Sequence, residues 1–400
     1  MISRRVSVLS VRWNGANRPD EYATTRTHGF LFGEVSKGTR SNMVLAFVTR
    51  LKPPRESALG TRLGVGLGVL TALLITVMLI SLSTGPLDIS VLHVVAIISE
   101  PVGIHLADYN RTEELVVEQI RMPRIVVGAL VGMALGVAGA TMQGLFRNPL
   151  ADPGTIGVAS GGAAAAVIAI ATGASTWFFL ALPLFALTGA IATAFLVYAI
   201  AIASGRFSVA TLILAGVAVS AFMGALISLL IVAVPERDTL RGILFWLAGG
   251  LNSRSWDHVW LSGPIIIVGG GVIVAFARDL NVLMMGDDDA RSLGVNVRVM
   301  RPVLLTAASV ITGVAVAVSG MIGFVGLIVP HMLRLVFGPD NRVLVPLSAV
   351  GGAVFLVLAD EIARTILAPA EIRVGIVTSF IGAPFFLFLL LRHNRRVNSL

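Results

Sequence analysis

The sequence contains no cysteine and only two lysines, Lys37 and Lys52, among its 30 basic residues. The absence of cysteine excludes disulfides and thiolate metal sites. A phosphate-binding P-loop needs a lysine followed by serine or threonine after a glycine-rich turn. Neither lysine meets this requirement, because Gly38 and Pro53 follow them. The chain therefore has no ATP site of this type, and any ATP that drives it must be hydrolysed by a partner.

Charged residues are also scarce. They make up 13% of the 400 residues, whereas hydrophobic residues make up 56%. A soluble domain carries roughly 25% charged residues. Too little polar surface is present to cover a water-soluble particle of this size, so the lipid bilayer is the expected solvent. Apolar runs of about 20 residues, the length that crosses a bilayer core, indicate an all-α polytopic membrane protein.

The apolar runs predict about ten transmembrane helices. The expected spans are residues 63–82, 125–145, 155–172, 177–203, 209–234, 259–276, 302–322, 323–337, 343–358 and 374–391. A polar stretch separates the first two spans. The mixed loop over residues 235–257 contains an apolar patch too short to cross, which we expect to form an interfacial helix.

The predicted domain organisation is a single transmembrane domain with polar ends. Residues 1–62 form a basic segment without an apolar run of spanning length, interpreted as a disordered cytoplasmic tail. Met43 offers an alternative start, because a more ordinary leader follows it. The transmembrane domain covers residues 63–396, and residues 397–400 are the end of a cytoplasmic tail.

An even number of spans places both termini on one side of the membrane. Lys and Arg are more numerous on the termini's side, and an excess of these residues marks cytoplasmic loops. Both termini are therefore predicted to be cytoplasmic. Arg121, Arg124 and Arg364 then face the outside.

An internal repeat is suggested by an offset of 181 residues, which aligns Gly132 with Gly313 and Pro149 with Pro330. One explanation is composition alone, because apolar, glycine-rich runs resemble one another. The alternative is a duplicated bundle in which spans two to five and seven to ten form inverted repeats. Transporters often place the substrate path between such repeats.

Small residues recur at every fourth position of the second span. In lipid, such stripes let a neighbouring helix approach closely. We interpret them as packing sites, which is weak evidence for any particular function. The predicted packing residues are Gly128, Gly132, Gly136, Gly139, Gly144, Gly313 and Gly320.

Acidic residues are missing from the first eight expected spans. Ion-coupled carriers usually place ionisable groups within the membrane, so their absence argues against that class. Asp360 and Glu361 lie near the outer end of the ninth span and are interpreted as a solvated helix end. His331 has no second ligand nearby in sequence, so we predict no metal site.

Two groups of charged residues suggest contacts with partners. Arg121 and Arg124 share one helix face at the outer mouth of the second span, and Arg364 closes the ninth span on the same side. They either reach towards lipid headgroups or dock an acidic partner surface. The inner loop places three acids before a short amphipathic turn, where they suit a helix N-terminus. This loop is either simply solvated or contacted by a cytoplasmic machine; its residues are Asp287, Asp288, Asp289, Ala290, Arg291 and Gly294.

Three long motifs resemble one protein family. RMPRIVVGALVGMALGVAGATMQGLFRNPLADPGTIGVASG (121–161) is similar to a signature of the iron–siderophore and cobalamin importer permeases. GMIGFVGLIVPHMLRLVFGPDNRVLVPLSA (320–349) and LADEIARTILAPAEIRVGIVTSFIGAPFFLFLLLR (358–392) resemble two further signatures. The resemblance covers about residues 63–396.

The resemblance implies a ten-span permease of an ATP-binding-cassette importer. It implies a second permease chain in a homodimer or heterodimer, two cytoplasmic ATPase subunits that bind ATP and Mg, and an extracytoplasmic substrate-binding protein. Arginines at the positions of Arg121, Arg124 and Arg364 would meet acids on the binding protein, and residues 287–294 would form the ATPase coupling loop. Many members have Gly-Glu where this chain has Gly-Asp-Asp-Asp, which puts the detail of that contact in doubt.

The predicted function is therefore transport across the bacterial cytoplasmic (inner) membrane. The substrate implied by the resemblance is a ferric siderophore or a related metal chelate such as haem or cobalamin, moved by alternating access. No catalytic residue, cofactor or nucleic-acid partner is expected for this chain. The alternative is an ion-coupled secondary carrier that needs no ATPase.

Overall fold

The computed structural model describes residues 56–203 and 209–397. The predicted tail up to residue 55, its alternative start and the last three residues lie outside these ranges. The bundle consists of α2 (Glu56–Ser83), α5 (Met122–Leu145), α6 (Val158–Ala171), α7 (Ala181–Ala203), α8 (Val209–Ala233), α10 (Trp256–Ala275), α13 (Val297–Ser319), α14 (Val325–Phe337), α15 (Asn341–Thr365) and α16 (Val374–Val397). Shorter connecting elements are α3 (Val91–Ser99), η1 (Glu100–Val102), α4 (Arg111–Leu115), η2 (Val116–Arg121), η3 (Pro153–Ile156), η4 (Ala174–Thr176), α9 (Arg237–Leu247), α11 (Ala277–Met285) and α12 (Asp287–Ser292).

The predicted all-α polytopic architecture is confirmed, and each expected span coincides with one bundle helix. Within the described ranges, seven helices are long and apolar enough to cross a membrane: Leu59–Ser83, Arg111–Leu145, Ala181–Ala203, Ala210–Ala233, Trp256–Ala275, Val297–Ser319 and Asn341–Thr365. α6, α14 and α16 contribute shorter apolar stretches. The amphipathic α9 occupies the mixed loop where an interfacial helix was expected.

Polar residues extend several helices beyond their predicted ends. The second apolar helix begins at Arg111 instead of residue 125, and α15 continues to Thr365 instead of residue 358. Asp360 and Glu361 therefore lie within α15. The prediction that they form a solvated helix end is wrong, because they are only 1% and 8% exposed.

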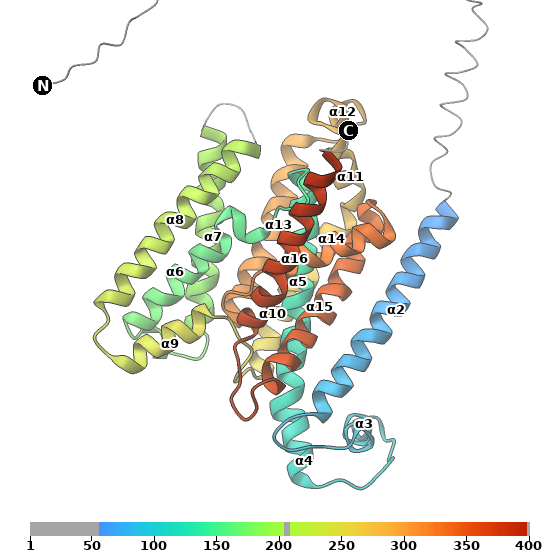
Figure 1. Ribbon diagram of the computed structural model, residues 1–400, viewed down its shortest axis with the longest axis vertical. Helices are drawn as coiled ribbons and strands as arrows, with labels where there is room; N and C mark the ends of the chain where they lie inside the picture. The colour runs from blue at the N-terminus through green and yellow to red at the C-terminus, as the bar shows by residue number, and fades with distance from the viewer. Residues whose placement is uncertain (1–55, 204–208, 398–400) are drawn as a thin grey trace, which may run out of the picture. The chain divides into compact units, whose positions relative to one another are not determined.

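The two ends of the bundle carry different connections. α12, the first turn of α2 and the last turn of α16 lie at one end, here called the α12 end (Figure 1). α3, α4 and α9 lie towards the opposite end, here called the α4 end. The polar stretch after α2 contains α3, whose Val94 and Ile97 are buried in a small apolar cluster with residues of α2 and α5.

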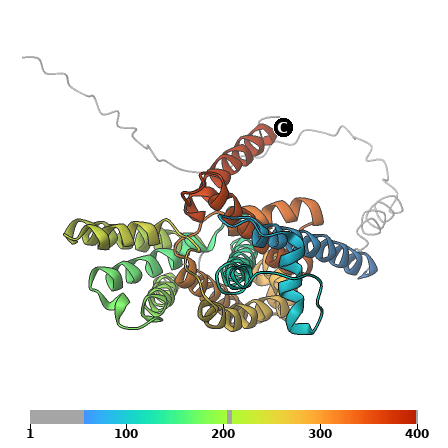
Figure 2. The ribbon, with the colours of Figure 1, turned by 90° about the horizontal axis from the view of Figure 1, so that it is seen from below.

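The most buried helix is α5, which runs through the middle of the bundle (Figure 2). It packs chiefly against α15, α13, α10 and α14. A Cβ atom on Gly132 would overlap the carbonyl oxygen of Gly352, and one on Gly136 would overlap that of Ser348. A Cβ on Gly139 would overlap the backbone of Gly326. The backbones of α5 and α15 are therefore in direct contact.

The remaining predicted packing glycines face other elements. Gly128 and Gly144 lie against side chains of Leu251 and Leu280. Gly313 lies against Ala190 of α7. Gly320 has a φ of 69° and follows the last residue of α13, where it caps the helix.

The helix contacts support the predicted inverted repeat. In the two repeats, α5, α6 and α7 correspond to α13, α14 and α15. The contact of α5 with α15 therefore matches that of α13 with α7, and the contact of α5 with α14 matches that of α13 with α6. α6 packs on α7 as α14 packs on α15. α5 begins near the α4 end, whereas α13 begins near α12, so the equivalent helices run in opposite directions (Figure 1).

One detail of the proposed alignment is wrong. Pro149 lies in the turn after α5, whereas Pro330 lies inside α14. The connection from α5 to α6 is longer than the connection from α13 to α14, so a single offset of 181 residues does not extend beyond the first helix pair.

Candidate functional site

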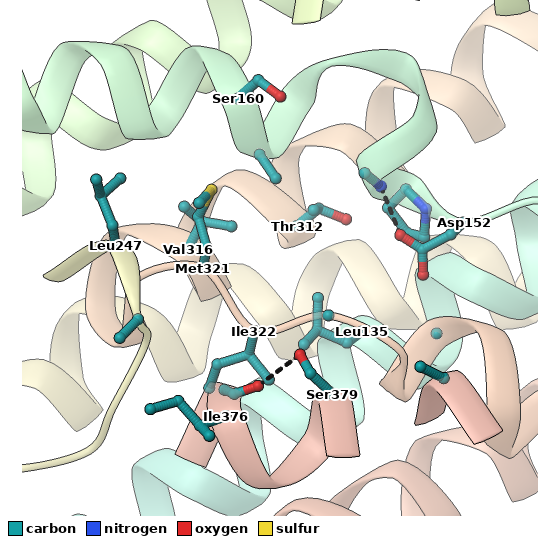
Figure 3. A pocket seen from close by; sticks show the side chains of 18 of the residues that line it. Leu135, Asp152, Ser160, Leu247, Thr312, Val316, Met321, Ile322, Ile376 and Ser379 are labelled. Carbon is teal, nitrogen blue, oxygen red and sulfur yellow. Dashed lines mark hydrogen bonds between the residues drawn. The ribbon is translucent and has the colours of Figure 1, made fainter. Parts of the chain in front are cut away.

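A cavity of about 780 Å³ lies between the two repeats. α5 and α6 contribute to its wall from the first repeat, and α13, α14 and α16 contribute from the second (Figure 3). Most of the lining is apolar, including Leu135, Leu247, Val316, Ile322, Ile376 and Phe380. Typical ligand sites have volumes of about 300–1,000 Å³, so a cavity of this size can hold a small molecule.

Three of the polar side chains in the wall bond to nearby backbone. Ser379 donates to the carbonyl of Gly375 at 2.7 Å, and Thr312 donates to that of Ala308 at 2.7 Å. The Asp152 carboxylate accepts a hydrogen bond from the Gly154 N–H at 2.8 Å, which caps η3 (Figure 3). The wall therefore presents mainly apolar surface, which suits passage better than tight binding.

Three glycines close the cavity towards the α4 end. A Cβ on Gly249, Gly320 or Gly375 would overlap a backbone carbonyl oxygen of a facing segment. Gly249 and Gly320 also have left-handed φ values of 66° and 69°. We call this three-way backbone contact the glycine junction.

The glycine junction is held by backbone hydrogen bonds. The N–H of Gly250 donates to Ser319 at 2.8 Å, and that of Gly375 donates to Gly249 at 3.3 Å. Leu247 and Ile322 line the cavity on one side of the junction, whereas Trp246 and Arg373 line a smaller pocket on the other. Any substrate that crosses this point requires the three backbone segments to separate.

The three arginines predicted to dock a partner lie at the α4 end, where Arg121 and Arg124 are buried and Arg364 is half-buried. Arg121 is 4% exposed and donates to the carbonyls of Leu82, Ser83 and Leu87, so it closes the end of α2. Arg364 contacts Glu361 and donates to the carbonyl of Ser81 at 2.9 Å.

Arg124 forms the centre of this buried network. Its Nε and Nη2 donate to the two carboxylate oxygens of Asp360 at 2.9 and 2.8 Å. Its Nη1 donates to Glu371 at 3.0 Å. The network joins α5, α15 and the segment before α16. A docking role for these arginines stays a prediction, since their guanidinium groups are occupied within the chain.

The predicted coupling loop forms α12, followed by a turn at Gly294 with a φ of 85°. Asp288, Asp289 and Arg291 point into solvent, whereas Ala290 is fully buried. Asp288 pairs only locally with Arg291, at 3.2 Å. The exposed charges of α12 are therefore available to a partner.

Asp287 ties α12 to the membrane helices. Its carboxylate accepts hydrogen bonds from Arg301 of α13 at 2.8 and 3.1 Å and lies 3.3 Å from Arg147, which follows α5. The hydrogen bonds from Arg301 lower the pKa of Asp287, so this carboxylate is ionised at neutral pH. Asp287 therefore links α12 to both α13 and the segment after α5.

A second link joins α11 to α15. The amide of Asn281 donates to Asp340 at 2.7 Å, and its carbonyl accepts from the backbone of Asn341 at 2.9 Å. Asp340 also caps α15. α11 and α12 together therefore contact the ends of α5, α13 and α15.

Reasoning from sequence did not single out Asp152, Arg254, Glu371 or Arg373. Asp152, Glu371 and Arg373 lie within the signature motifs, and these motifs could have drawn attention to them. His331 stands apart from other candidate ligands, and no group of metal-ligating side chains occurs within residues 56–203 and 209–397.

Comparison with known proteins agrees with this geometry. The chain matches the FecCD transport family over residues 73–392. It is 47% identical over 289 residues to the cobalamin import system permease protein BtuC of Halobacterium salinarum, covering 72% of this chain and 76% of that protein. It is 41% identical over 280 residues to the hemin transport system permease protein HmuU of Yersinia pestis, covering 69% and 83%.

A longer match and a solved structure extend the comparison. The iron(3+)-hydroxamate import system permease protein FhuG of Bacillus subtilis is 36% identical over 328 residues, covering 80% of this chain and 95% of that protein. A metal-chelate type ABC transporter in an inward-facing conformation superposes with a TM-score of 0.72 at 31% identity, covering 82% of this chain and 98% of that one.

The fold and the cavity between its repeats define a multi-pass transport protein of the permease class. The family match and the named relatives identify one family within that class. The chain belongs to the FecCD transport family.

Proposed function

We propose that the chain is the permease subunit of an ATP-driven importer for a metal chelate. The observation that carries this proposal is the largely apolar cavity of about 780 Å³ between two inverted repeats, closed by the glycine junction at one end. Two packed halves around a central site suit alternating access, in which the halves rock against each other.

The apolar cavity and the named relatives support a proposal for the substrate class. Its apolar wall accommodates a bulky ligand without fixing its orientation through many polar contacts. The named relatives are permeases for cobalamin, hemin and iron(3+)-hydroxamate. We propose a ferric siderophore, or a related chelate such as haem or cobalamin, as the substrate of this chain.

The proposed orientation in the cytoplasmic membrane places the α12 end and both termini in the cytoplasm. The exposed charges of α12 then face two ATPase subunits, which supply the ATP and Mg sites that this chain lacks. A second permease chain completes the transporter as a homodimer or heterodimer. A substrate-binding protein meets the α4 end from outside.

Uptake into vesicles tests this function. We expect ATP-dependent accumulation of ferric hydroxamate, hemin or cobalamin when the chain is reconstituted with its ATPase and binding protein, because the chain has no energy source of its own. Vesicles without the ATPase serve as the control. Accumulation driven by an imposed ion gradient, and indifferent to the ATPase, would identify a secondary carrier instead.

The coupling helix is tested in the same vesicles. Arg301→Gln is expected to lower ATP-dependent uptake several-fold, because it removes the charge-assisted hydrogen bonds that tie α12 to α13. Arg298→Gln is the matched control, since Arg298 lies on the same turn region of α13 and is exposed. Equal uptake by the two variants would contradict a role for this link in coupling.

We also propose that Arg121, Arg124 and Arg364 support docking of the binding protein. The arginines already have partners within the chain, so acids of the binding protein would have to replace Asp360, Glu361 or backbone carbonyls as those partners. Arg364→Gln is then expected to weaken association more than Arg111→Gln, whose side chain is 73% exposed at the same end. The measurement is the affinity of the binding protein at low salt. Unchanged affinity in a folded Arg364→Gln protein excludes this contact.

A further inference from the structure

A small pocket of about 160 Å³ lies beyond the glycine junction, on the side of the α4 end. Its lining combines two arginines with an indole: Gly242, Phe245, Trp246, Gly250, Arg254, Ser319 and Arg373. These residues come from α9, the loop before α10, the end of α13 and the segment before α16. The main cavity lies on the other side of the junction.

Arg254 differs from the other arginines buried at this end. Arg124 and Arg364 contact carboxylates, and Arg121 donates to three backbone carbonyls. No carboxylate in the described part of the chain lies within 4.0 Å of Arg254, which also donates to no carbonyl there. Its Nη1 donates to the imidazole Nε2 of His258 at 3.1 Å, and its buried Nε has no hydrogen-bond partner. Burial, with a smaller contribution from the charge of Arg373, lowers the pKa of Arg254 to about 10, which leaves it protonated at neutral pH.

Arg373 supplies a second positive charge to the pocket. Its Nη1 donates to Asn252 at 2.8 Å, and its guanidinium lies 4.4 Å from the centre of the Phe245 ring. Neither contact neutralises the charge. The nearest acid on the same segment, Glu371, is engaged with Arg124 and Asn252. Two like charges therefore share a confined space, and Glu371, which acts on Arg373 from a distance, forms no ion pair with either guanidinium.

Trp246 also lines the pocket. It is 8% exposed, and its buried indole Nε1 donates to nothing within the described structure. A buried N–H without a partner is unfavourable by about 1–3 kcal/mol relative to a bonded one. An anionic ligand in the pocket would lie beside the guanidinium groups of Arg254 and Arg373.

We propose that this pocket binds a single oxyanion group, a carboxylate or a phosphate. A guanidinium presents parallel N–H donors that match the two oxygens of such a group. The volume fits one anionic group and excludes a whole metal chelate. The bound group would bridge the loop before α10, which contains Gly249 of the glycine junction, and the segment before α16, which leads directly to Gly375 of the junction.

The test uses the purified full-length chain in detergent, with acetate or inorganic phosphate titrated at constant ionic strength. We expect a saturable rise in the thermal unfolding midpoint and a saturable change in tryptophan fluorescence. Trp246→Phe should abolish the fluorescence change. Ferric citrate, titrated separately, tests whether the carboxylate can also be presented by a chelate.

The variant Arg254→Gln is expected to raise the half-saturating concentration at least about tenfold, the effect of losing one charge-assisted hydrogen bond. Arg241→Gln is the matched control, because Arg241 is exposed on α9 and lies outside the pocket. If Arg254→Gln does not fold, Arg373→Gln replaces it in the same titration. The proposal is overturned when none of the three probes gives saturable binding, or when binding is equal in wild type, Arg254→Gln and Arg373→Gln.

Discussion

Replacing Arg124 with methionine is expected to lower the free energy of unfolding by about 3–5 kcal/mol, the usual consequence of removing one partner of a buried ion pair. Asp360 would remain in place with a side chain that is 2% exposed and would lose two hydrogen bonds from the guanidinium. Glu371 would also lose a partner. The measurement is chemical unfolding of the purified chain in mixed micelles.

Two comparisons separate this effect from a general loss of charge. Arg111→Met removes an exposed pair with Glu114 and is expected to lower the free energy of unfolding by less than about 1 kcal/mol. The double variant Arg124→Met with Asp360→Leu should recover part of the loss, because it leaves fewer uncompensated buried charges. Equal stability of Arg124→Met and Arg111→Met would show that the buried network does not hold α5 to α15.

The variant Gly132→Ala is expected to destabilise the chain by about 1–3 kcal/mol or more, the range found for overpacked cores. The added methyl group would overlap the carbonyl oxygen of Gly352, so α5 and α15 would have to separate. No side-chain rotation can relieve this overlap, because the obstructing atom belongs to the backbone. The same unfolding measurement provides the value.

The matched control is Gly270→Ala in α10, where an added Cβ would meet no heavy atom within 4 Å. Alanine favours a helix over glycine by roughly 0.8–1.0 kcal/mol in water. We therefore expect no loss of stability in Gly270→Ala. A loss equal to that of Gly132→Ala would argue against close helix contact as the cause.

The positions of the bundle helices were predictable from hydropathy, whereas their ends were not. α6 and α8 coincide closely with apolar runs, because a bilayer selects each span by its own composition. α15 extends past its apolar run to Thr365. Its last turns contain Asp360, Glu361 and Arg364, which are buried or half-buried because they find partners on other elements.

The candidate site was predictable only in part. The segment that forms α12 was singled out from its acids, but the link from Asp287 to Arg301 and Arg147 depends on α12 folding back onto two helices. The cavity and the glycine junction had no local signal. Gly249, Gly320 and Gly375 are far apart in sequence and meet only through tertiary packing.

The sequence by itself determined the membrane environment, the all-α class, the approximate spans and the family. These properties follow from composition and continuous motifs, which act over one helix length at a time. Tertiary structure alone decided which charges are buried, where the cavity lies and which arginines lack an acid. Arg124 and Asp360 are 236 residues apart in the chain yet share two hydrogen bonds. Whether a charge is paired depends on residues that are distant in the chain, and these cannot be predicted from a local sequence pattern.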